Sequence, residues 1–139
     1  MSDNYERAKE QAQAQFNFIV EALTAFNIAQ KSEFGAAEFD GEVLTEEKII
    51  TRIQELPLSL EIQSCWHSPG QTAIEGRFQI LLCTGGPAVR IIGDLDKYYT
   101  PDSARLQMQD WLLDWKDFWL SSYDEEILLD FSRLFSFSE

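Results

Sequence analysis

The spacing of apolar residues changes along this chain, and that change is what most constrains its fold. In the first thirty residues they recur every three or four positions, the period of an α-helix with one buried face. Between about residues 58 and 110 they alternate with polar residues, the period of a β-strand, and a helical period then returns. The 139 residues are therefore predicted to form a single α+β domain over 1–139. It would comprise a helical part (1–57), an antiparallel sheet (58–110), and an aromatic, acidic segment with a C-terminal helix (111–139).

Three helices are predicted from the apolar spacing and from capping signals. The first covers about 4–30, with an apolar stripe of Tyr5, Ala8, Ala12, Phe16, Ile19, Leu23 and Phe26. This stripe is expected to dock on a sheet, and pairing of two copies through it is the alternative. A short second helix is predicted to begin after the N-cap Thr45 and to end at Pro57. The third covers about 123–135, with Ser122 as its cap and Glu125 reaching back.

The remaining segments are interpreted as strands and loops. Residues 32–47 are interpreted as a loop because Gly35 and Gly41 punctuate them. Four strands are predicted, and the first of them, from Leu58 to Trp66, is expected to be half-buried. Because the connections are short, and Thr84-Gly85-Gly86-Pro87 is typical of a tight reversal, the strands are expected to form a four-stranded antiparallel meander.

The chain carries 24 acidic and 11 basic residues, a formal net charge of -13. Such a charge repels nucleic acid phosphates and anionic membranes, so neither is expected as a direct partner. It attracts basic surfaces, including the grooves of nucleic-acid-binding proteins and ribonucleoproteins. The alternative interpretation is that the acidity serves only solubility.

The acidic residues are concentrated in two blocks, 33–47 and 110–139. The candidate partner-binding residues of the first block are Glu33, Glu38, Asp40 and Glu42. Those of the second block are Asp110, Trp111, Asp114, Trp115, Asp117, Trp119, Asp124, Glu125 and Glu126. Carboxylates on a rigid surface can imitate the spaced charges of nucleic acid, and Trp is enriched at binding hot spots.

The segment 110–119 interleaves these two residue types. If it is helical, its three Asp lie on one face, with Trp111 and Trp115 on a neighbouring face. The alternative is that the aromatic rings fill the core where the sheet meets the last helix.

Residues suited to catalysis or metal binding are few. The chain has two cysteines, Cys65 and Cys83, and one histidine, His67, with no ligand spacing typical of zinc. The sequence therefore predicts no metal, no cofactor, reduced thiols and a cytoplasmic location. Cys65 and His67 would share one strand face, which leaves a small enzyme or ligand-binding domain as an alternative.

The segment from Gln79 to Asp96 resembles the core of a small family encoded by phages, prophages and plasmids. So do Gln109-Asp110-Trp111 followed by Trp115, and the ending from Leu128-Leu129 to Phe135-Ser136-Phe137. The resemblance covers roughly 75–139. It implies host-takeover or anti-defence work in the cytoplasm of a host cell, including anti-CRISPR and antirestriction activity, and supplies no catalytic residues. Relatives have a Gly-Thr-Pro-like turn after the Asp-Trp pair, where this chain has Leu112-Leu113-Asp114.

Three functions are therefore expected, in descending order. The first is a non-catalytic inhibitor that binds a host defence complex by acidic occlusion or mimicry of nucleic acid. The second is a structural, assembly or regulatory protein that forms a homodimer. The third is a small enzyme or ligand-binding domain that uses Cys65 and His67.

Overall fold

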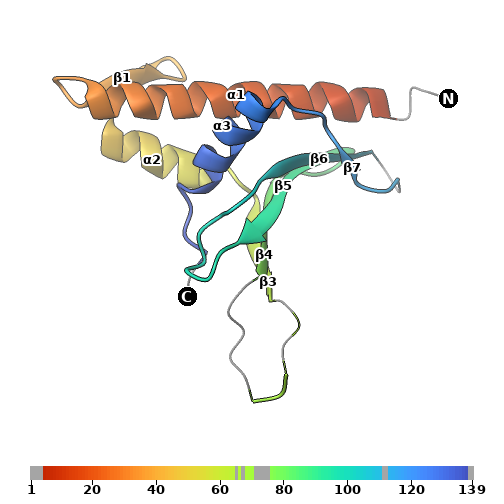
Figure 1. Ribbon diagram of the computed structural model, residues 1–139. Coiled ribbons are helices and arrows are strands. Elements are labelled where there is room, and N and C mark those ends of the chain that lie inside the picture. The colour runs from red at the N-terminus through yellow and green to blue at the C-terminus, as the bar shows by residue number, and fades with distance from the viewer. Residues whose placement is uncertain (1–4, 65, 67, 71–75, 111–112, 138–139) are drawn as a thin grey trace.

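The computed structural model describes residues 5–64, 66, 68–70, 76–110 and 113–137. Over these residues the chain forms three helices, a two-stranded sheet and a five-stranded sheet, which confirms the α+β class (Figure 1). In chain order the elements are α1 (Glu6–Lys31), β1 (Ala36–Phe39), β2 (Glu42–Thr45), α2 (Glu46–Glu55), β3 (Ser59–Ser64), β4 (Gly76–Cys83), β5 (Pro87–Leu95), β6 (Arg105–Asp110), β7 (Lys116–Asp117) and α3 (Ser122–Ser132).

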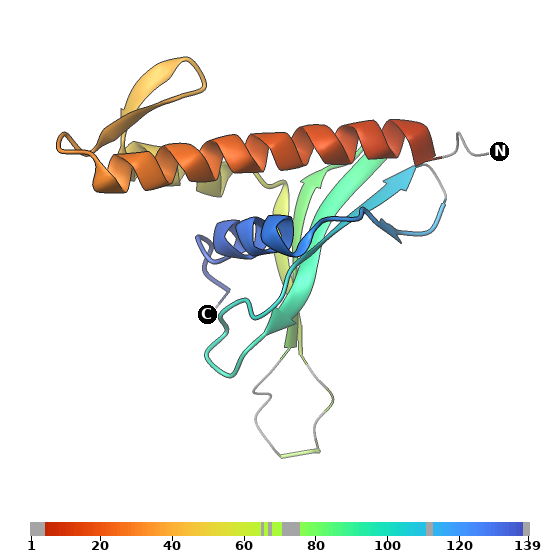
Figure 2. The same ribbon diagram turned by 45° about the horizontal axis from the view of Figure 1, so that its top comes forward.

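Helix α1 is the longest element, and its apolar stripe packs inside the protein. The predicted positions from Ala8 to Phe26 are buried, and Ala22, Ala25 and Ala29 extend the buried face. Small alanine side chains let neighbouring elements approach the helix closely. The helix contacts α2 and α3, the two-stranded sheet, and strands β5 and β6 (Figures 1 and 2).

The loop predicted over 32–47 is wrong, because β1 and β2 form an antiparallel hairpin there. Asp40 (φ 53°) and Gly41 (φ 81°) both have the left-handed backbone that a two-residue hairpin turn requires. One face of the hairpin buries Ala37, Phe39 and Leu44, and the Phe39 ring lies 5.6 Å from that of Phe18 on α1. Helix α2 follows directly, and Thr45 caps it as predicted, accepting a 3.3 Å hydrogen bond from the Lys48 amide.

The large sheet is an antiparallel meander in the order β3-β4-β5-β6-β7. The four predicted strands are therefore present, and the two-residue β7 adds a fifth. The helical arrangement considered for 110–119 is not formed by its described residues: Asp110 ends β6, and Lys116 and Asp117 pair back against Met108 and Gln107.

The core lies between one face of this sheet and the helices. Its largest fully buried side chains include Phe78, Ile80, Ile91, Leu106 and Met108 from the strands and Leu128 and Phe131 from α3. Gly93 is required on β5, because a Cβ there would collide with the Ser103 carbonyl and lie 2.8 Å from the Phe78 ring.

Two further expectations need correction. Strand β3 forms, but its apolar side is not buried in the core: Leu60 and Ile62 are 41% and 42% exposed, and Leu58, just before the strand, is 61% exposed. The cap of α3 is Ser121, whose Oγ accepts from the Asp124 amide at 3.1 Å, and Ser122 is the first helical residue. No helix in the described part of the chain has the length and apolar character needed to cross a membrane.

Candidate functional site

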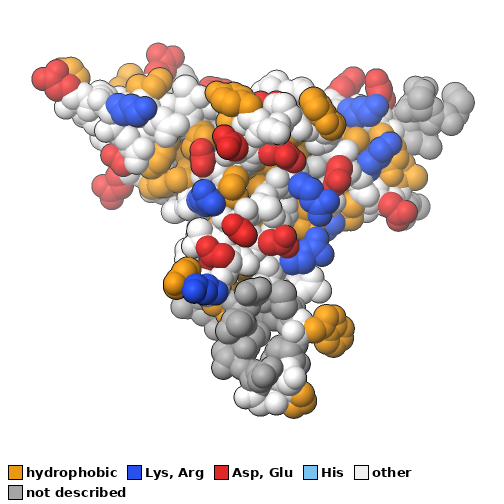
Figure 3. Space-filling model, in the orientation of Figure 1, with side chains coloured by type: hydrophobic (Ala, Val, Ile, Leu, Met, Phe, Trp, Pro, Cys, Tyr) orange, Lys and Arg blue, Asp and Glu red, His pale blue; other side chains and the backbone are white. Residues whose placement is uncertain are grey.

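The carboxylates of the first acidic block come together around the β1–β2 hairpin. We use the name acidic tip for this surface, which comprises Glu33, Phe34, Glu38, Asp40, Glu42, Val43, Glu46 and Glu47. All eight side chains are exposed, and residues 33–47 contain no Lys or Arg. Figure 3 shows carboxylates around this end of the molecule, and a group of Lys and Arg side chains towards the large sheet.

The acidic tip also exposes apolar side chains, which sequence reasoning missed. Phe34 is 86% exposed and Val43 is 76% exposed. Val43 lies directly opposite Glu38 in the hairpin, so the two side chains share its outward face. Neighbouring residues of a strand point to opposite faces, so Val43 is exposed because Leu44 is buried, and this alternation in the sequence could have indicated it.

The backbone of the acidic tip is held in place from both sides. The buried face of the hairpin packs on α1, and the Glu46 amide donates a 3.0 Å hydrogen bond to the Gly35 carbonyl. Arg52 on α2 forms a 2.8 Å ion pair with Glu42. These contacts fix the backbone of the acidic tip, so its carboxylates have defined positions.

The second acidic block is divided by the structure. Asp110 is buried and forms a 3.1 Å ion pair with the exposed Arg7 of α1, so it is part of the framework rather than of a surface. The backbone carbonyl of the exposed Asp114 accepts a 2.8 Å hydrogen bond from the Tyr5 hydroxyl. Together these contacts join Tyr5 and Arg7, at the start of α1, to the end of β6 and the chain that follows it.

Trp115 is half-buried, and it stacks on an arginine. The Arg90 guanidinium carbon lies 4.1 Å from the centre of a Trp115 ring, within the range of a cation–π interaction. Arg90 is at the middle of β5, on the sheet face opposite the helices. Trp115 therefore covers part of the outer face of the sheet, and its role in partner binding stays a prediction.

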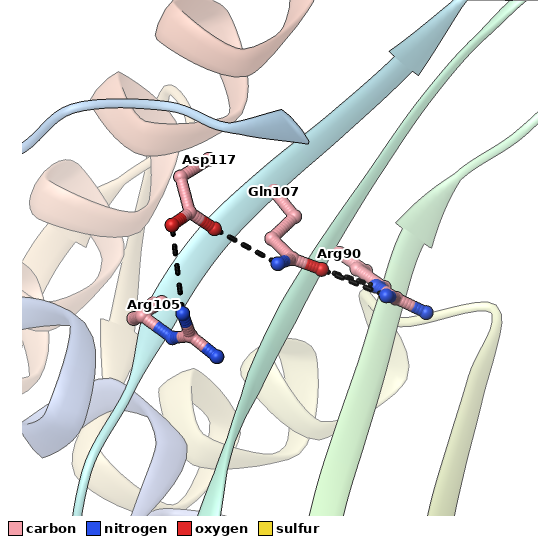
Figure 4. A network of polar contacts seen from close by, with 4 residues as sticks. All are labelled: Arg90, Arg105, Gln107 and Asp117. Atoms are coloured by element: carbon pink, nitrogen blue, oxygen red, sulfur yellow. Dashed lines mark hydrogen bonds and ion pairs between the residues drawn. The ribbon is translucent and has the colours of Figure 1, made fainter. Parts of the chain in front are cut away.

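Arg90 is the centre of a polar belt that crosses all five strands, with Glu61, Gln79, Gln107 and Asp117 as its other members. Gln107 Oε1 accepts from Arg90 Nε at 2.9 Å and from Nη2 at 2.7 Å, while its Nε2 donates to Asp117 at 2.8 Å (Figure 4). On the other side, Gln79 accepts from Arg90 Nη1 at 2.6 Å and donates to Glu61 at 2.8 Å. The two glutamines thus connect one central cation to a carboxylate at each edge of the sheet.

The belt lies among further positive charges. Burial lowers the pKa of the Arg90 guanidinium, and the nearby charges of Arg77 and Arg105 lower it further. Arg105 reaches Asp117 at 3.5 Å, which closes the β7 end of the belt. An arginine remains charged at neutral pH despite such a shift, so this sheet face carries the cations that the acidic tip lacks.

The remaining residues of the second block are grouped near the start of α3. A groove of about 360 Å³ is lined in part by Asp117, Trp119 and Glu125, and Trp119 is 82% exposed. Asp124 is half-buried in the first turn of α3, and Glu126 is exposed there. The structure therefore brings three of the predicted residues together, on a surface distinct from the acidic tip.

Trp111, Cys65 and His67 lie outside the described residues, so the predicted Cys65–His67 pair stays a prediction. Cys83 is half-buried at the end of β4, and its Sγ lies 3.9 Å from the Pro87 carbonyl. Burial raises the pKa of this thiol, which outweighs the opposite effects of contacts with Gln11 and Val89. A raised pKa disfavours the nucleophilic thiolate at neutral pH.

The chain was compared with protein families, with curated proteins and with solved structures. No family model, curated protein or solved structure matches it.

Proposed function

We propose that this protein is a non-catalytic binding protein of a phage or other mobile element, which inhibits a host defence complex. It does so by placing the acidic tip on a basic surface where that complex binds nucleic acid. The observation that carries the proposal is the composition of the tip: six exposed carboxylates and two exposed large apolar side chains on the β1–β2 hairpin, the turn before it and the start of α2, with the hairpin packed on α1.

The charge of the tip suits a surface that binds phosphates. A groove that binds nucleic acid is lined by Lys and Arg, and carboxylates such as Glu38 and Asp40 would replace phosphates as the anions that pair with them. Replacement of phosphates by carboxylates in the groove requires no catalytic step. Inhibition would then follow from occupancy alone.

The apolar side chains suit a protein partner rather than a solubilising role. A surface that served solubility alone would gain nothing from Phe34 and Val43, which expose apolar area to water. At an interface, such side chains become buried anchors, and the surrounding charges direct encounter and orientation. The tip combines both features within fifteen consecutive residues, 33–47.

The proposal is tested by affinity purification from host cells that carry CRISPR and restriction systems, followed by binding measurements on the purified complex. The tip variant Glu33→Gln, Glu38→Gln, Asp40→Asn is compared with the α1 variant Glu6→Gln, Glu10→Gln, Glu21→Gln, which removes the same charge from other exposed positions. We expect the tip variant to bind about tenfold more weakly or worse, and the α1 variant to bind nearly normally. Added nucleic acid should displace the protein, and rising salt should weaken its binding.

Two outcomes would reject the proposal. Equal weakening by the two variants would show that net charge alone acts, without a defined surface. Purification that recovers no nucleic-acid-binding complex would remove the proposed target. A third variant, Phe34→Ser, tests the apolar contribution, and unchanged affinity would restrict the interface to its charges.

A further inference from the structure

Strand β3 is an edge strand with an uncovered apolar side. Its residues Leu60 and Ile62 pair with Ile80 and Phe78 of β4, so their side chains point to the face of the sheet that forms the core. Ile80 and Phe78 are buried, whereas Leu60 and Ile62 are 41% and 42% exposed. The apolar face of the sheet therefore continues one strand beyond its cover, and the exposed Leu58 comes directly before β3.

The described part of the chain covers this strip only in part. Helices α1 and α3 pack over other parts of the sheet and fold, and no helix makes a substantial contact with β3. Among the described strands, β3 pairs with β4 alone, which leaves the N–H and C=O groups of its other edge available. Proteins usually protect such an edge with Lys, Pro or a bulge, and residues 59–64 contain neither residue and pair regularly with β4.

We propose that a second copy of this chain pairs with β3 through its own β3, as antiparallel strands related by a two-fold axis. The two sheets would then join edge to edge into one. The proposal concerns a surface separate from the acidic tip, so it stands or falls independently of the proposed function.

The residues of β3 favour one register for this pairing. With the axis at Leu60, that residue meets Leu60 of the second copy, and extension of the pairing by one residue before β3 brings Leu58 opposite Ile62 of the second copy. On the opposite face, Glu61 meets Ser59 of the second copy. The exposed apolar residues are thus buried against one another, and no like charges are opposed.

The neighbouring registers are less favourable. With the axis at Glu61, the two Glu61 carboxylates lie directly opposite each other, which is repulsive. With the axis at Ile62, Leu60 meets Ser64 of the second copy and loses its apolar partner. The charge of Glu61 is moderated in every case by its 2.8 Å hydrogen bond from Gln79.

The first experiment measures mass in solution by sedimentation over a wide range of protein concentration. We expect a reversible change from monomer to dimer, with a Kd on the order of micromolar. Because each copy carries a net charge of -13, rising salt should strengthen the dimer by screening repulsion. This is the opposite of the salt effect expected for binding of the acidic tip to a basic partner.

A pair of variants locates the contact. Leu60→Lys places two ammonium groups at the centre of the pairing, and we expect the dimer to weaken at least tenfold. The control Val43→Lys makes the same change at another exposed strand position, and the dimer should persist. Circular dichroism of both variants checks that the monomer stays folded, which their exposure favours.

Cross-linking with a short bifunctional maleimide tests the register, in a background with Cys65 and Cys83 replaced by serine. Leu60→Cys places two thiols opposite each other and should cross-link readily. Ile62→Cys places them about 14 Å apart, four strand positions from each other, and should not.

The outcomes are decisive in either direction. A monomeric mass at every concentration, or a dimer that Leu60→Lys leaves unchanged, would overturn the proposal. Cross-linking of Ile62→Cys in place of Leu60→Cys would overturn the register. A protein that stays monomeric, and whose capture of a defence complex is abolished by Leu60→Lys, would assign the β3 edge to a strand of the target instead.

Discussion

At the scale of single residues, the contact between Arg7 and Asp110 is asymmetric. The Asp110 side chain is 6% exposed, whereas the Arg7 side chain is 67% exposed. A carboxylate held away from water needs its cation more than an exposed cation needs a carboxylate. The pair therefore fixes the start of α1 to the end of β6.

We expect Arg7→Met to lower the free energy of unfolding by about 1–2 kcal/mol, because it leaves the buried carboxylate without its partner. The control Arg52→Met breaks the exposed pair with Glu42 and should lower it by less than about 0.5 kcal/mol. Urea denaturation measures both. Equal losses would show that the burial of Asp110 has no energetic consequence.

The raised pKa of Cys83 predicts how the reactivity of this thiol depends on pH. In a Cys65→Ser background, alkylation of the folded protein by iodoacetamide should be slow at neutral pH. The alkylation rate should reach its plateau at a higher pH in the folded protein than in the urea-unfolded protein. Mass spectrometry at a series of pH values measures both rates, and coincident profiles would contradict the shift.

The raised pKa of Cys83 also makes the stability of the protein depend on pH. Because the folded protein disfavours the thiolate, the contribution of Cys83 is fully present below the unfolded pKa of the thiol. It is lost as the pH rises through the folded value.

At the scale of elements, the cap of α3 offers a test with a matched control. Ser121 accepts a hydrogen bond from the Asp124 amide, whereas Ser122 is exposed in the first turn. We expect Ser121→Ala to lower the free energy of unfolding by about 1 kcal/mol and Ser122→Ala to change it little. Thermal or urea denaturation distinguishes them, and the reverse order would return the cap to Ser122.

The elements that the sequence predicted well are those with long, regular periods. Helix α1 and strands β4 to β6 each repeat an apolar position enough times to identify both the element and its buried face. The β1–β2 hairpin was missed because each strand has only four residues, although Asp40-Gly41 is a strong turn signal. Periodicity identified the apolar side of β3 as well, but it carries no information on whether a helix reaches that side.

The candidate site was predictable to a similar degree. The density of carboxylates located the acidic tip, because neighbours in sequence remain neighbours on a hairpin. The contact of Trp115 with Arg90 joins residues 25 positions apart, and the buried Asp110 pairs with Arg7, 103 positions away. Such contacts depend on how the elements pack, which local composition does not determine.

At the scale of the whole molecule, charge is divided between the sheet and the other elements. Strands β3 to β7 contain four acidic and four basic residues, whereas residues 6–55 contain ten acidic and five basic. Helix α3 adds four acidic residues and no basic residue. Repulsion is therefore concentrated in the helices and the hairpin.

We expect added NaCl to raise the midpoint of thermal unfolding, because screening reduces this repulsion in the folded state. The α1 variant Glu6→Gln, Glu10→Gln, Glu21→Gln should show a smaller response, since part of the repulsion is already removed. Scanning calorimetry in low and high salt measures the difference. A midpoint that falls with salt would show that attractive pairs outweigh the excess of carboxylates.

Strand β7 is only two residues long, and this limits how such a molecule can polymerise. A sheet with two long free edges can add copies head to tail without end, which leads to fibres. Here one edge is a six-residue strand, and the other is a two-residue strand whose Asp117 is engaged by Gln107 and Arg105. Association through β3 would occupy the long edge of the large sheet in both copies, so assembly would stop at the dimer.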